Sequence, residues 1–425
     1  MFTKIFDTYS QNTAVITDYG QVVTYAELGK MVNDKAAGLT PHVLQFCLCE
    51  NNLDSLVMYL ACLLAKAPVV MLNAHMDGES LNTLRELYRP GQTVCHSSLA
   101  LCLTTSGSTG SPKLVRLTME NIISNAESIA TYLQIDEQER AITMLPMYYS
   151  YGLSIVNSHL LKGATLLLTD KTYAQREFWN FLRENKATSM AGVPYTWEML
   201  KRLRFFRMDL PSVKTMTQAG GKLNADSAKE YIQNAREQGK RFIVMYGQTE
   251  ATARMSYLPW ERAEEKYASI GIAIPGGRLD LAEDGELVYF GTNVSMGYAE
   301  CAEDLLKGDE NHGVLHTGDI ARVDEDGFYY IVGRKKRFVK VWGNRCNLDA
   351  IEQIVKSLGI AECAVVGVDD MITIFVMDSE KEGTILHLLT EKTGLNTRAF
   401  RVRKIDKIPT KESGKIDYQA LQAML

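Results

Sequence analysis

Short apolar runs alternate with longer stretches of helical periodicity over the first two-thirds of the chain. Each run has the length of a buried strand and is bounded by polar residues, glycine or proline. The runs are Val43–Leu48, Ala67–Leu72, Leu99–Thr104, Ala164–Thr169, Ser189–Val193 and Phe242–Tyr246. Between them, segments such as Met119–Leu133 and Ala174–Glu184 repeat apolar residues at helical spacing. Alternating strands and helices predict an α/β fold of parallel sheets covered by helices.

The pattern changes after Ser269. Two Asp-Gly pairs, at 284–285 and 326–327, are each followed by β-forming residues, which is a strong signal for hairpins. A small β-rich and more antiparallel region is therefore expected after the α/β part. The basic cluster Arg334–Arg337 comes next, and its apolar flanks favour a domain junction over a targeting signal.

The segment beyond the basic cluster predicts a small α+β unit. It contains an amphipathic helix predicted at Leu348–Leu358, two short strands at Ala364–Val368 and Ile372–Met377, and a second helix at Thr384–Thr393. A length of 425 residues exceeds one ordinary core, so more than one domain is expected.

Composition narrows the classes of function. A net charge of −5 with 46% hydrophobic and 23% charged residues is typical of a soluble globular protein without an affinity for nucleic acid. The most apolar stretch, Leu56–Leu72, is interrupted by Lys66 and Pro68, so a buried helix and strand are expected rather than a membrane span. The eight cysteines lack the spacing of a zinc site. Without a secretory signal, they are interpreted as reduced thiols of a cytoplasmic protein.

A loop rich in glycine and hydroxyl side chains follows the predicted strand Leu99–Thr104. It reads Thr-Ser-Gly-Ser-Thr-Gly-Ser-Pro-Lys and ends at Lys113. Glycines let backbone N–H groups approach a polyanion, hydroxyls donate further hydrogen bonds, and an ammonium neutralises charge. The spacing differs from that of a Walker loop. A Gly/Ser/Thr loop by itself is more often a surface turn, but this one is a candidate phosphate site.

The order of residues in this loop resembles the phosphate loop of the AMP-forming adenylating enzymes, the family of acyl-CoA synthetases, peptide-synthetase adenylation domains and luciferases. Further segments are similar to motifs of that family, in the same order along the chain. They are Gln218–Lys222, Met245–Glu250, Thr317–Asp319 with Arg334, Lys336–Gly343, and Ile408–Asp417. The chain is identified as a compact member, because its phosphate loop begins earlier than in typical relatives and part of the N-terminal subdomain is expected to be missing.

The resemblance implies two domains. Residues 1–335 would form a large adenylating domain with the ATP and acid sites, including the β-rich subdomain. Residues 336–425 would form a small, mobile α+β lid, with a hinge at Lys336. Rotation of the lid about this hinge would separate the two half-reactions of the family.

The resemblance also implies ATP and Mg²⁺ as cofactors. Met245–Glu250 lies at the end of a predicted strand, where ligands bind in open α/β sheets, and its tyrosine and carboxylate suit a purine and a magnesium ion. In the family pattern Tyr246 stacks on adenine and Glu250 binds Mg²⁺, while Asp319 and Arg334 contact the ribose. The other implied nucleotide-binding residues are Thr105, Ser106, Gly107, Ser108, Thr109, Gly110, Lys113, Gly220, Gly221, Gly247, Gln248 and Thr249.

Catalytic roles follow from the same resemblance. Lys415 takes the principal role, contacting the substrate carboxylate and the α-phosphate during adenylation. Lys113 and Glu250 assist by neutralising charge, as phosphoryl chemistry requires. Lys340 and Gly343 lie in the loop that serves the thiol half-reaction.

The acid pocket is expected at Pro146–Leu153, which looks more like the form found in acyl- and aryl-CoA ligases than that of amino-acid-activating domains. Tyr149, Ser150 and Tyr151 are the candidate substrate-binding residues, although core packing is an equal reading of the tyrosines. No acidic residue occurs between Leu145 and Leu161, so the ammonium of an amino acid would stay unpaired. A neutral tail is therefore expected, of the aryl, hydroxyacyl or fatty type.

The expected activity is acid adenylation by ATP with release of pyrophosphate, followed by transfer to a thiol with release of AMP. The thiol belongs either to coenzyme A or to the phosphopantetheine arm of an acyl carrier protein. The partners are thus a small carboxylic acid and one of these thiols, with no nucleic acid. Two alternatives stay open: a D-alanine-like carrier-protein ligase, and a nucleotide-binding pseudoenzyme.

Overall fold

The structure is a computed structural model, and it describes residues 2–104, 113–335, 337–342, 344–360, 362–377, 380–410 and 416–425. The chain divides into two compact units. The first comprises residues 1–279 and 289–315, and the second comprises residues 280–288 and 316–425. The hinge position Lys336 lies outside the described residues, so the boundary at 335/336 stays a prediction.

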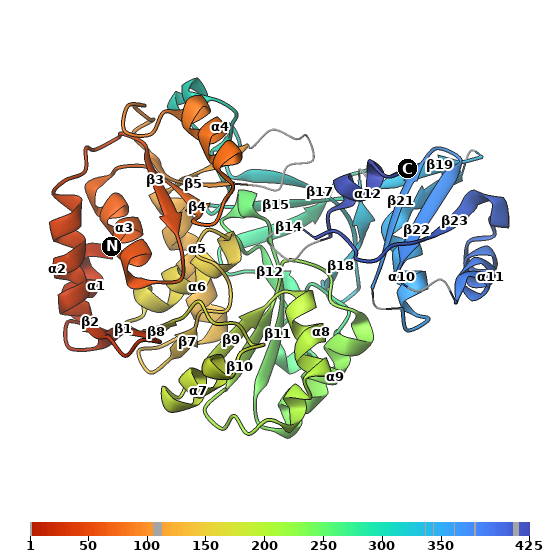
Figure 1. Ribbon diagram of the computed structural model, residues 1–425, viewed down its shortest axis with the longest axis horizontal. Helices are drawn as coiled ribbons and strands as arrows, with labels where there is room; N and C mark the ends of the chain where they lie inside the picture. Colours follow the sequence, from red (N-terminus) through yellow and green to blue (C-terminus); the bar gives the residue numbers. More distant parts are fainter. Residues whose placement is uncertain are drawn as a thin grey trace. The chain divides into compact units, whose positions relative to one another are not determined.

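The first unit contains a large mixed sheet with the strand order β13-β12-β11-β10-β9-β7-β8-β1-β2 (Figure 1). Neighbours from β1 to β11 pair in parallel, and the pairs β1–β2, β11–β12 and β12–β13 are antiparallel. The bounds are β1 Thr13–Thr17, β2 Val22–Thr24, β7 Arg140–Ile142, β8 Thr165–Leu168, β9 Ser189–Gly192, β10 Thr215–Gln218, β11 Arg241–Tyr246, β12 Ser256–Tyr257 and β13 Ile272–Ala273.

A second sheet of the first unit has the order β16-β6-β5-β4-β3. Strands β3, β4 and β5 are parallel, whereas β6 is antiparallel to both β5 and β16. The bounds are β3 Gln45–Cys49, β4 Val69–Asn73, β5 Leu99–Thr104, β6 Leu114–Thr118 and β16 Gly297–Ala299. The parallel strands β3, β4 and β5 agree with the predicted parallel sheet. The antiparallel strands β6 and β16 were not predicted.

Helices of the first unit pack against both sheets. Helix α5 begins where Thr118 and Asn121 form a capping box, which satisfies free N–H groups of its first turn. Apolar residues of α3, α6 and the strands β4, β5 and β8 share one buried cluster. The bounds are α1 Phe2–Thr8, α2 Tyr25–Ala36, α3 Leu53–Ala65, α4 Gly78–Tyr88, α5 Met119–Leu133, α6 Ser150–Leu161, α7 Arg176–Glu184, α8 Pro194–Arg202 and α9 Ala225–Glu237.

The β-rich region predicted after Ser269 is present as a sheet with the order β14-β15-β17-β18. Asp284-Gly285 lies in the turn between β14 and β15, and Asp326-Gly327 in the turn between β17 and β18. Each glycine has a positive φ of 81°, as an Asp-Gly turn requires. The bounds are β14 Gly277–Leu281, β15 Glu286–Gly291, β17 Val314–Val323 and β18 Tyr329–Arg334.

The C-terminal part of the second unit is the α+β structure that the sequence predicts. Strand β22 pairs antiparallel with β21 and parallel with β23, and β19 and β20 form a hairpin. One buried apolar cluster includes residues of α10, α11 and all of these strands except β20. The bounds are β19 Phe338–Val341, β20 Asn344–Asn347, α10 Leu348–Lys356, β21 Cys363–Val368, β22 Met371–Val376, α11 Glu382–Thr393, β23 Phe400–Lys404 and α12 Tyr418–Gln422.

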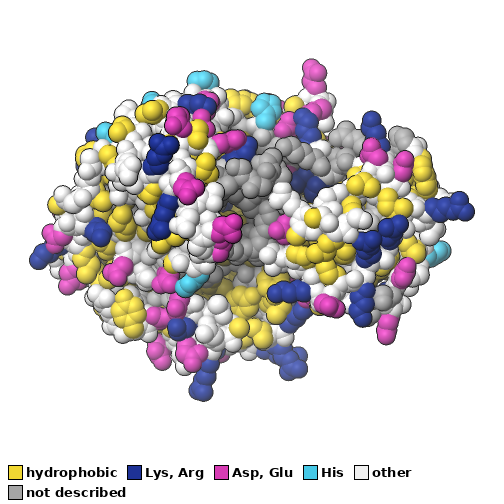
Figure 2. All heavy atoms as spheres, turned by 45° about the horizontal axis from the view of Figure 1, so that its top comes forward, with side chains coloured by type: hydrophobic (Ala, Val, Ile, Leu, Met, Phe, Trp, Pro, Cys, Tyr) yellow, Lys and Arg dark blue, Asp and Glu magenta, His cyan; other side chains and the backbone are white. Residues whose placement is uncertain are grey.

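The predicted α/β fold class is therefore confirmed. Within the described part of the chain, none of the helices combines the length and apolar character needed to cross a membrane. The face in Figure 2 shows basic and acidic side chains interspersed among the described residues, so they form no extended field of one sign there.

Candidate active site

The candidate site lies at the carboxyl edge of the large sheet. The register aligns Gln218, the last residue of β10, with Gly192 at the end of β9 and with Val244 near the end of β11. The loops that follow these three parallel strands therefore leave the sheet at one edge. This is where open α/β sheets bind their ligands.

The first of these loops is Tyr246–Glu250, which follows β11. Tyr246 is partly buried, and its hydroxyl accepts a hydrogen bond of 3.4 Å from Gln248 Nε2. A side chain at Gly247 would place its Cβ only 1.8 Å from the carbonyl oxygen of Ala253. The backbone can take this path only without a Cβ, which explains the glycine in the motif.

Glu250 is held by groups from other parts of the first unit. Its Oε1 accepts a hydrogen bond of 2.7 Å from the hydroxyl of Tyr298 on β16. Its carbonyl oxygen accepts a bond of 2.8 Å from the backbone N–H of Ser295. Burial and the Glu250 charge raise the pKa of Tyr298, so the phenol stays protonated and remains the donor.

A divalent ion would fit Glu250 as a single protein ligand. Among the described residues, no partner contacts its Oε2, and no group of three or more His, Cys, Asp or Glu side chains is placed to hold a metal. Mg²⁺ is commonly held by one or two carboxylates together with phosphate oxygens and water. The donor set therefore suits a magnesium–nucleotide complex better than a metal bound by protein alone.

Lys113 lies directly before β6 and forms an ion pair of 2.5 Å with Glu300. Strands β5 and β6 are antiparallel, and Thr104 pairs with Leu114, so the ends of the connecting loop lie side by side. The predicted phosphate-binding residues of that loop lie outside the described residues: Thr105, Ser106, Gly107, Ser108, Thr109 and Gly110.

The glycine turn after β10 lies against the predicted acid motif. Gly220 has a φ of +84°, and a Cβ there would lie 2.4 Å from the hydroxyl oxygen of Tyr149. The carbonyl of Gly221 accepts a hydrogen bond of 2.8 Å from Gln218 Nε2. Only glycine avoids both the backbone strain and the steric conflict at position 220.

The acid motif also contacts the loop after β11. Ser150, the first residue of α6, is buried, and its Oγ lies 3.1 Å from Oγ1 of Thr249. Two of the predicted substrate-binding residues, Tyr149 and Ser150, thus contact residues predicted to bind the nucleotide. The structure brings these three motifs together within the first unit.

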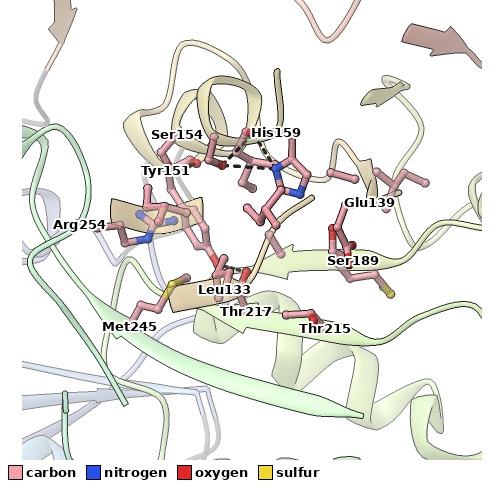
Figure 3. Close-up of a pocket in the computed structure, with 18 residues that line it drawn as sticks. Leu133, Glu139, Tyr151, Ser154, His159, Ser189, Thr215, Thr217, Met245 and Arg254 are labelled. Carbon is pink, nitrogen blue, oxygen red and sulfur yellow. Dashed lines mark hydrogen bonds between the residues drawn. The ribbon is translucent and has the colours of Figure 1, made fainter. Parts of the chain in front are cut away.

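Tyr151 points into the space between α6 and the sheet (Figure 3). Its hydroxyl lies 2.8 Å from Oγ1 of Thr217, and burial raises the pKa of this phenol to about 12. The guanidinium of Arg254 lies 3.9 Å from the centre of its ring. Arg254 is buried in a segment between Thr249–Ala251 and β12.

The predicted ribose contacts are close together in the second unit. Asp319 on β17 pairs in register with Arg334 on β18, and Arg334 Nε lies 3.4 Å from the Asp319 carboxylate. Lys340 on β19 has an exposed side chain, and its backbone N–H donates to Asp369. Three further predicted residues, Lys336, Gly343 and Lys415, lie outside the described part of the chain.

Tyr298 and Arg254 are the residues of this region that sequence reasoning missed. Tyr298 is 48 positions from Glu250 and reaches it only through the pairing of β16 with β6. Arg254 stands alone in the segment Ala251–Ser256. The sequence signal that could have identified Arg254 is a single charged residue between small and apolar residues.

Comparison with known proteins identifies the family. The sequence pattern of the AMP-binding enzyme family matches residues 85–299, and the chain belongs to this family. It is similar to a feruloyl-CoA synthase of Amycolatopsis sp, with 30% identity over 297 residues, or 66% of this chain and 59% of that protein. The chain thus spans less than two-thirds of the length of this relative.

Solved structures share the fold over nearly the whole chain. An o-succinylbenzoate CoA synthetase (MenE) from Bacillus subtilis, in complex with the acyl-adenylate intermediate, has a TM-score of 0.83 at 21% identity, covering 99% of this chain and 97% of the other. The same enzyme with ATP and magnesium ion has a TM-score of 0.82 at 20% identity, with 98% and 97% covered.

Proposed function

We propose that this chain activates a carboxylic acid as an acyl-adenylate and transfers the acyl group to the thiol of coenzyme A. The observation that carries the proposal is the convergence of three elements at one sheet edge. Ser150 of the acid motif contacts Thr249 of the loop that carries Glu250, and Tyr149 contacts the Gly220 turn. An acid and a nucleotide bound by these motifs would lie next to each other.

The chemistry needs positioning and charge neutralisation more than covalent help from the protein. In the first step an oxygen of the acid attacks the α-phosphorus of ATP, the bond to the β-phosphate oxygen breaks, and pyrophosphate leaves. In the second step a thiol sulfur attacks the acyl carbon, the bond to the phosphate oxygen breaks, and AMP leaves with its electron pair. The thiol proton passes to solvent.

The roles of individual residues belong to the proposal. Tyr246 would stack on adenine and Glu250 would hold Mg²⁺, which supplies positive charge next to the phosphates. Lys113 would exchange its partner Glu300 for a phosphate. In the second unit, the Asp319 and Arg334 pair would contact the ribose, and Lys415 would act during adenylation.

Relatives and neighbours that are named as CoA ligases favour coenzyme A as the acceptor. The phosphopantetheine arm of a carrier protein presents the same thiol and is the alternative acceptor. An amino-acid carrier-protein ligase and a pseudoenzyme remain the competing functions. A cytoplasmic location is likewise a proposal.

The test is a complete reaction with ATP, Mg²⁺, a panel of acids, and either coenzyme A or a phosphopantetheinylated carrier protein. We expect AMP and an acyl-CoA thioester in equal amounts with one class of acid. The variant Glu250→Gln should lose both products. Glu230→Gln, which removes a carboxylate that pairs with Lys201 on the protein surface, is the matched control and should lose neither.

Each competing function has its own outcome. Thioester on the carrier protein with D-alanine, and none on coenzyme A, would replace the proposal by the alternative ligase. ATP binding without AMP from any acid would indicate a pseudoenzyme.

A further inference from the structure

Arg254 is a buried cation whose surroundings contain phenols rather than carboxylates. Its side chain is 2% exposed, and its Nη1 donates a hydrogen bond of 3.2 Å to the carbonyl of Ala253. Its Nε is buried without a hydrogen-bond partner, and among the described residues no carboxylate forms an ion pair with it. Its charge acts instead on Tyr132, Tyr149 and Tyr151 and opposes the rise of their pKa values.

The tyrosines do not compensate for the desolvation of this charge. Moving an ion into the interior carries a large desolvation cost. A cation above an aromatic ring recovers part of such a cost, and the Arg254 guanidinium lies 3.9 Å from the centre of the Tyr151 ring. An anion next to Arg254 would supply the remainder.

A cavity lies in front of this cation. It has a free volume of about 30 Å³ and is lined by Arg254, Tyr151, Leu133, Met245 and His159 among others (Figure 3). A water-sized group needs about 10–15 Å³, so the cavity accepts two such groups, which is the size of a carboxylate. Tyr151, which lines the cavity, directly follows Tyr149 and Ser150 in the predicted acid motif.

The other ionisable groups of the cavity do not neutralise Arg254. Glu139 lies at the opposite end of the cavity in Figure 3 and accepts a hydrogen bond from the hydroxyl of Thr188. His159 is also buried, and burial lowers its pKa to about 4, so it is uncharged near neutral pH. The remaining walls are mostly apolar.

We infer that Arg254 is a specificity-determining residue, which pairs with a second anionic group at the far end of the carboxylic acid that this chain activates. The inference rests on the proposed function. This inference differs from the neutral substrate tail that the sequence of residues 145–161 led us to expect. The difference arises because Arg254 lines the cavity although it belongs to another segment of the chain. The substrate class is an acid with two anionic groups, one reacting with ATP and the other bound by the guanidinium.

The test compares matched pairs of acids in ATP–pyrophosphate exchange: succinate with butyrate, adipate with hexanoate, and terephthalate with 4-methylbenzoate. We expect the chain to prefer the dianionic member of one pair by at least about tenfold, the scale of one hydrogen bond to a charged group. Arg254→Met should remove or reverse this preference. Arg254→Lys keeps a charge without the planar fork and should retain part of it.

A matched control is available on the surface of the first unit. Arg278 also lies 3.9 Å above an aromatic ring, that of Phe290, but its side chain is exposed and outside the cavity. Arg278→Met should leave the preference unchanged. The fold of each variant is checked by thermal unfolding, and replacing an unpaired buried charge by an apolar residue of similar length should not lower the melting temperature.

Two outcomes would overturn the inference, and they are distinguishable. Exchange that favours the neutral acids, or an equal ratio in the wild type and in Arg254→Met, would overturn it and leave the proposed function standing. The absence of exchange with every acid would contradict the proposed function and the inference together.

Discussion

The hydroxyl of Tyr298 donates a hydrogen bond of 2.7 Å to the carboxylate of Glu250, although the two residues are 48 positions apart. The bond joins the edge strand β16 of one sheet to the loop after β11 of the other. A partner of this kind fixes the orientation of a metal-binding carboxylate. Its loss typically lowers metal affinity about 10- to 100-fold.

We therefore predict that Tyr298→Phe raises the Mg²⁺ concentration needed for half-maximal activity by roughly tenfold, while activity at saturating Mg²⁺ changes less. A magnesium titration of acid-dependent exchange measures this directly. Tyr330→Phe is the control, because Tyr330 donates a similar bond of 2.9 Å to Asp324, a carboxylate with no predicted role in the site. Identical magnesium curves for the wild type and Tyr298→Phe would show that this hydrogen bond does not support metal binding by Glu250.

Gly220 offers a steric test of the acid pocket. Gly220→Ala should reduce acid-dependent activity, because the new Cβ would lie 2.4 Å from the hydroxyl of Tyr149. Tyr149→Phe in the same chain removes that oxygen and should restore part of the activity. Gly276→Ala controls for backbone strain, since Gly276 has a φ of +81° but nothing within 4 Å of its Cβ. If Tyr149→Phe rescues nothing, the contact between turn and acid motif has no functional role.

The burial of His159 leads us to predict that the folding stability of the protein depends on pH. His159 is buried on α6, its Nδ1 lies 2.9 Å from the carbonyl oxygen of Ile155, and burial lowers its pKa from 6.5 to about 4. The unfolded chain therefore binds the proton more readily, so stability is full above pH 6.5 and is lost as the pH falls toward 4. The shift corresponds to about 3 kcal/mol.

Urea unfolding at pH 7.5 and at pH 5 measures this effect. His159→Gln should unfold with a smaller difference between the two pH values than the wild type. His387→Gln, which replaces an exposed histidine on α11, should behave like the wild type. An unchanged difference in His159→Gln would assign the pH dependence to other groups.

The family resemblance predicts that Lys415 acts in the adenylation step. Lys415→Ala should slow adenylate formation about 100- to 1,000-fold, the scale of losing one charge-stabilising group. It should leave thioester formation from a supplied acyl-adenylate much less affected. Lys407→Ala, an exposed lysine of the same C-terminal segment, is the control. An equal loss in both half-reactions would remove the role assigned to Lys415.

Local signals in the sequence predicted much of the fold. Strand β5 and helix α5 have the predicted bounds, Leu99–Thr104 and Met119–Leu133, because an apolar run and a helical repeat of apolar residues are both patterns of residues close together in the sequence. Both Asp-Gly hairpins were predicted for the same reason. The antiparallel placement of β6 and the short strand β16 were not, since they depend on pairing between distant segments.

The same contrast between local sequence signals and contacts between distant segments holds for the candidate site. Tyr246, Glu250 and Gly220 were predicted because their segments resemble motifs of the family, and Met245–Glu250 also lies at the end of a predicted strand. Tyr298 and Arg254 act through contacts made only in the folded chain. The neutral tail expected from residues 145–161 stays a prediction, and the inference drawn from Arg254 opposes it, because the sequence of that segment says nothing about a basic residue from another segment.

The central claim is that this chain forms an acyl-adenylate, and ATP–pyrophosphate exchange tests it most directly. Labelled pyrophosphate is incubated with ATP, Mg²⁺ and a panel of benzoates, fatty acids, hydroxy acids, dicarboxylates and D- and L-alanine. We predict label in ATP that depends on one class of acid and is lost in Glu250→Gln. Tight binding of ATP without exchange in the presence of any acid would contradict the account.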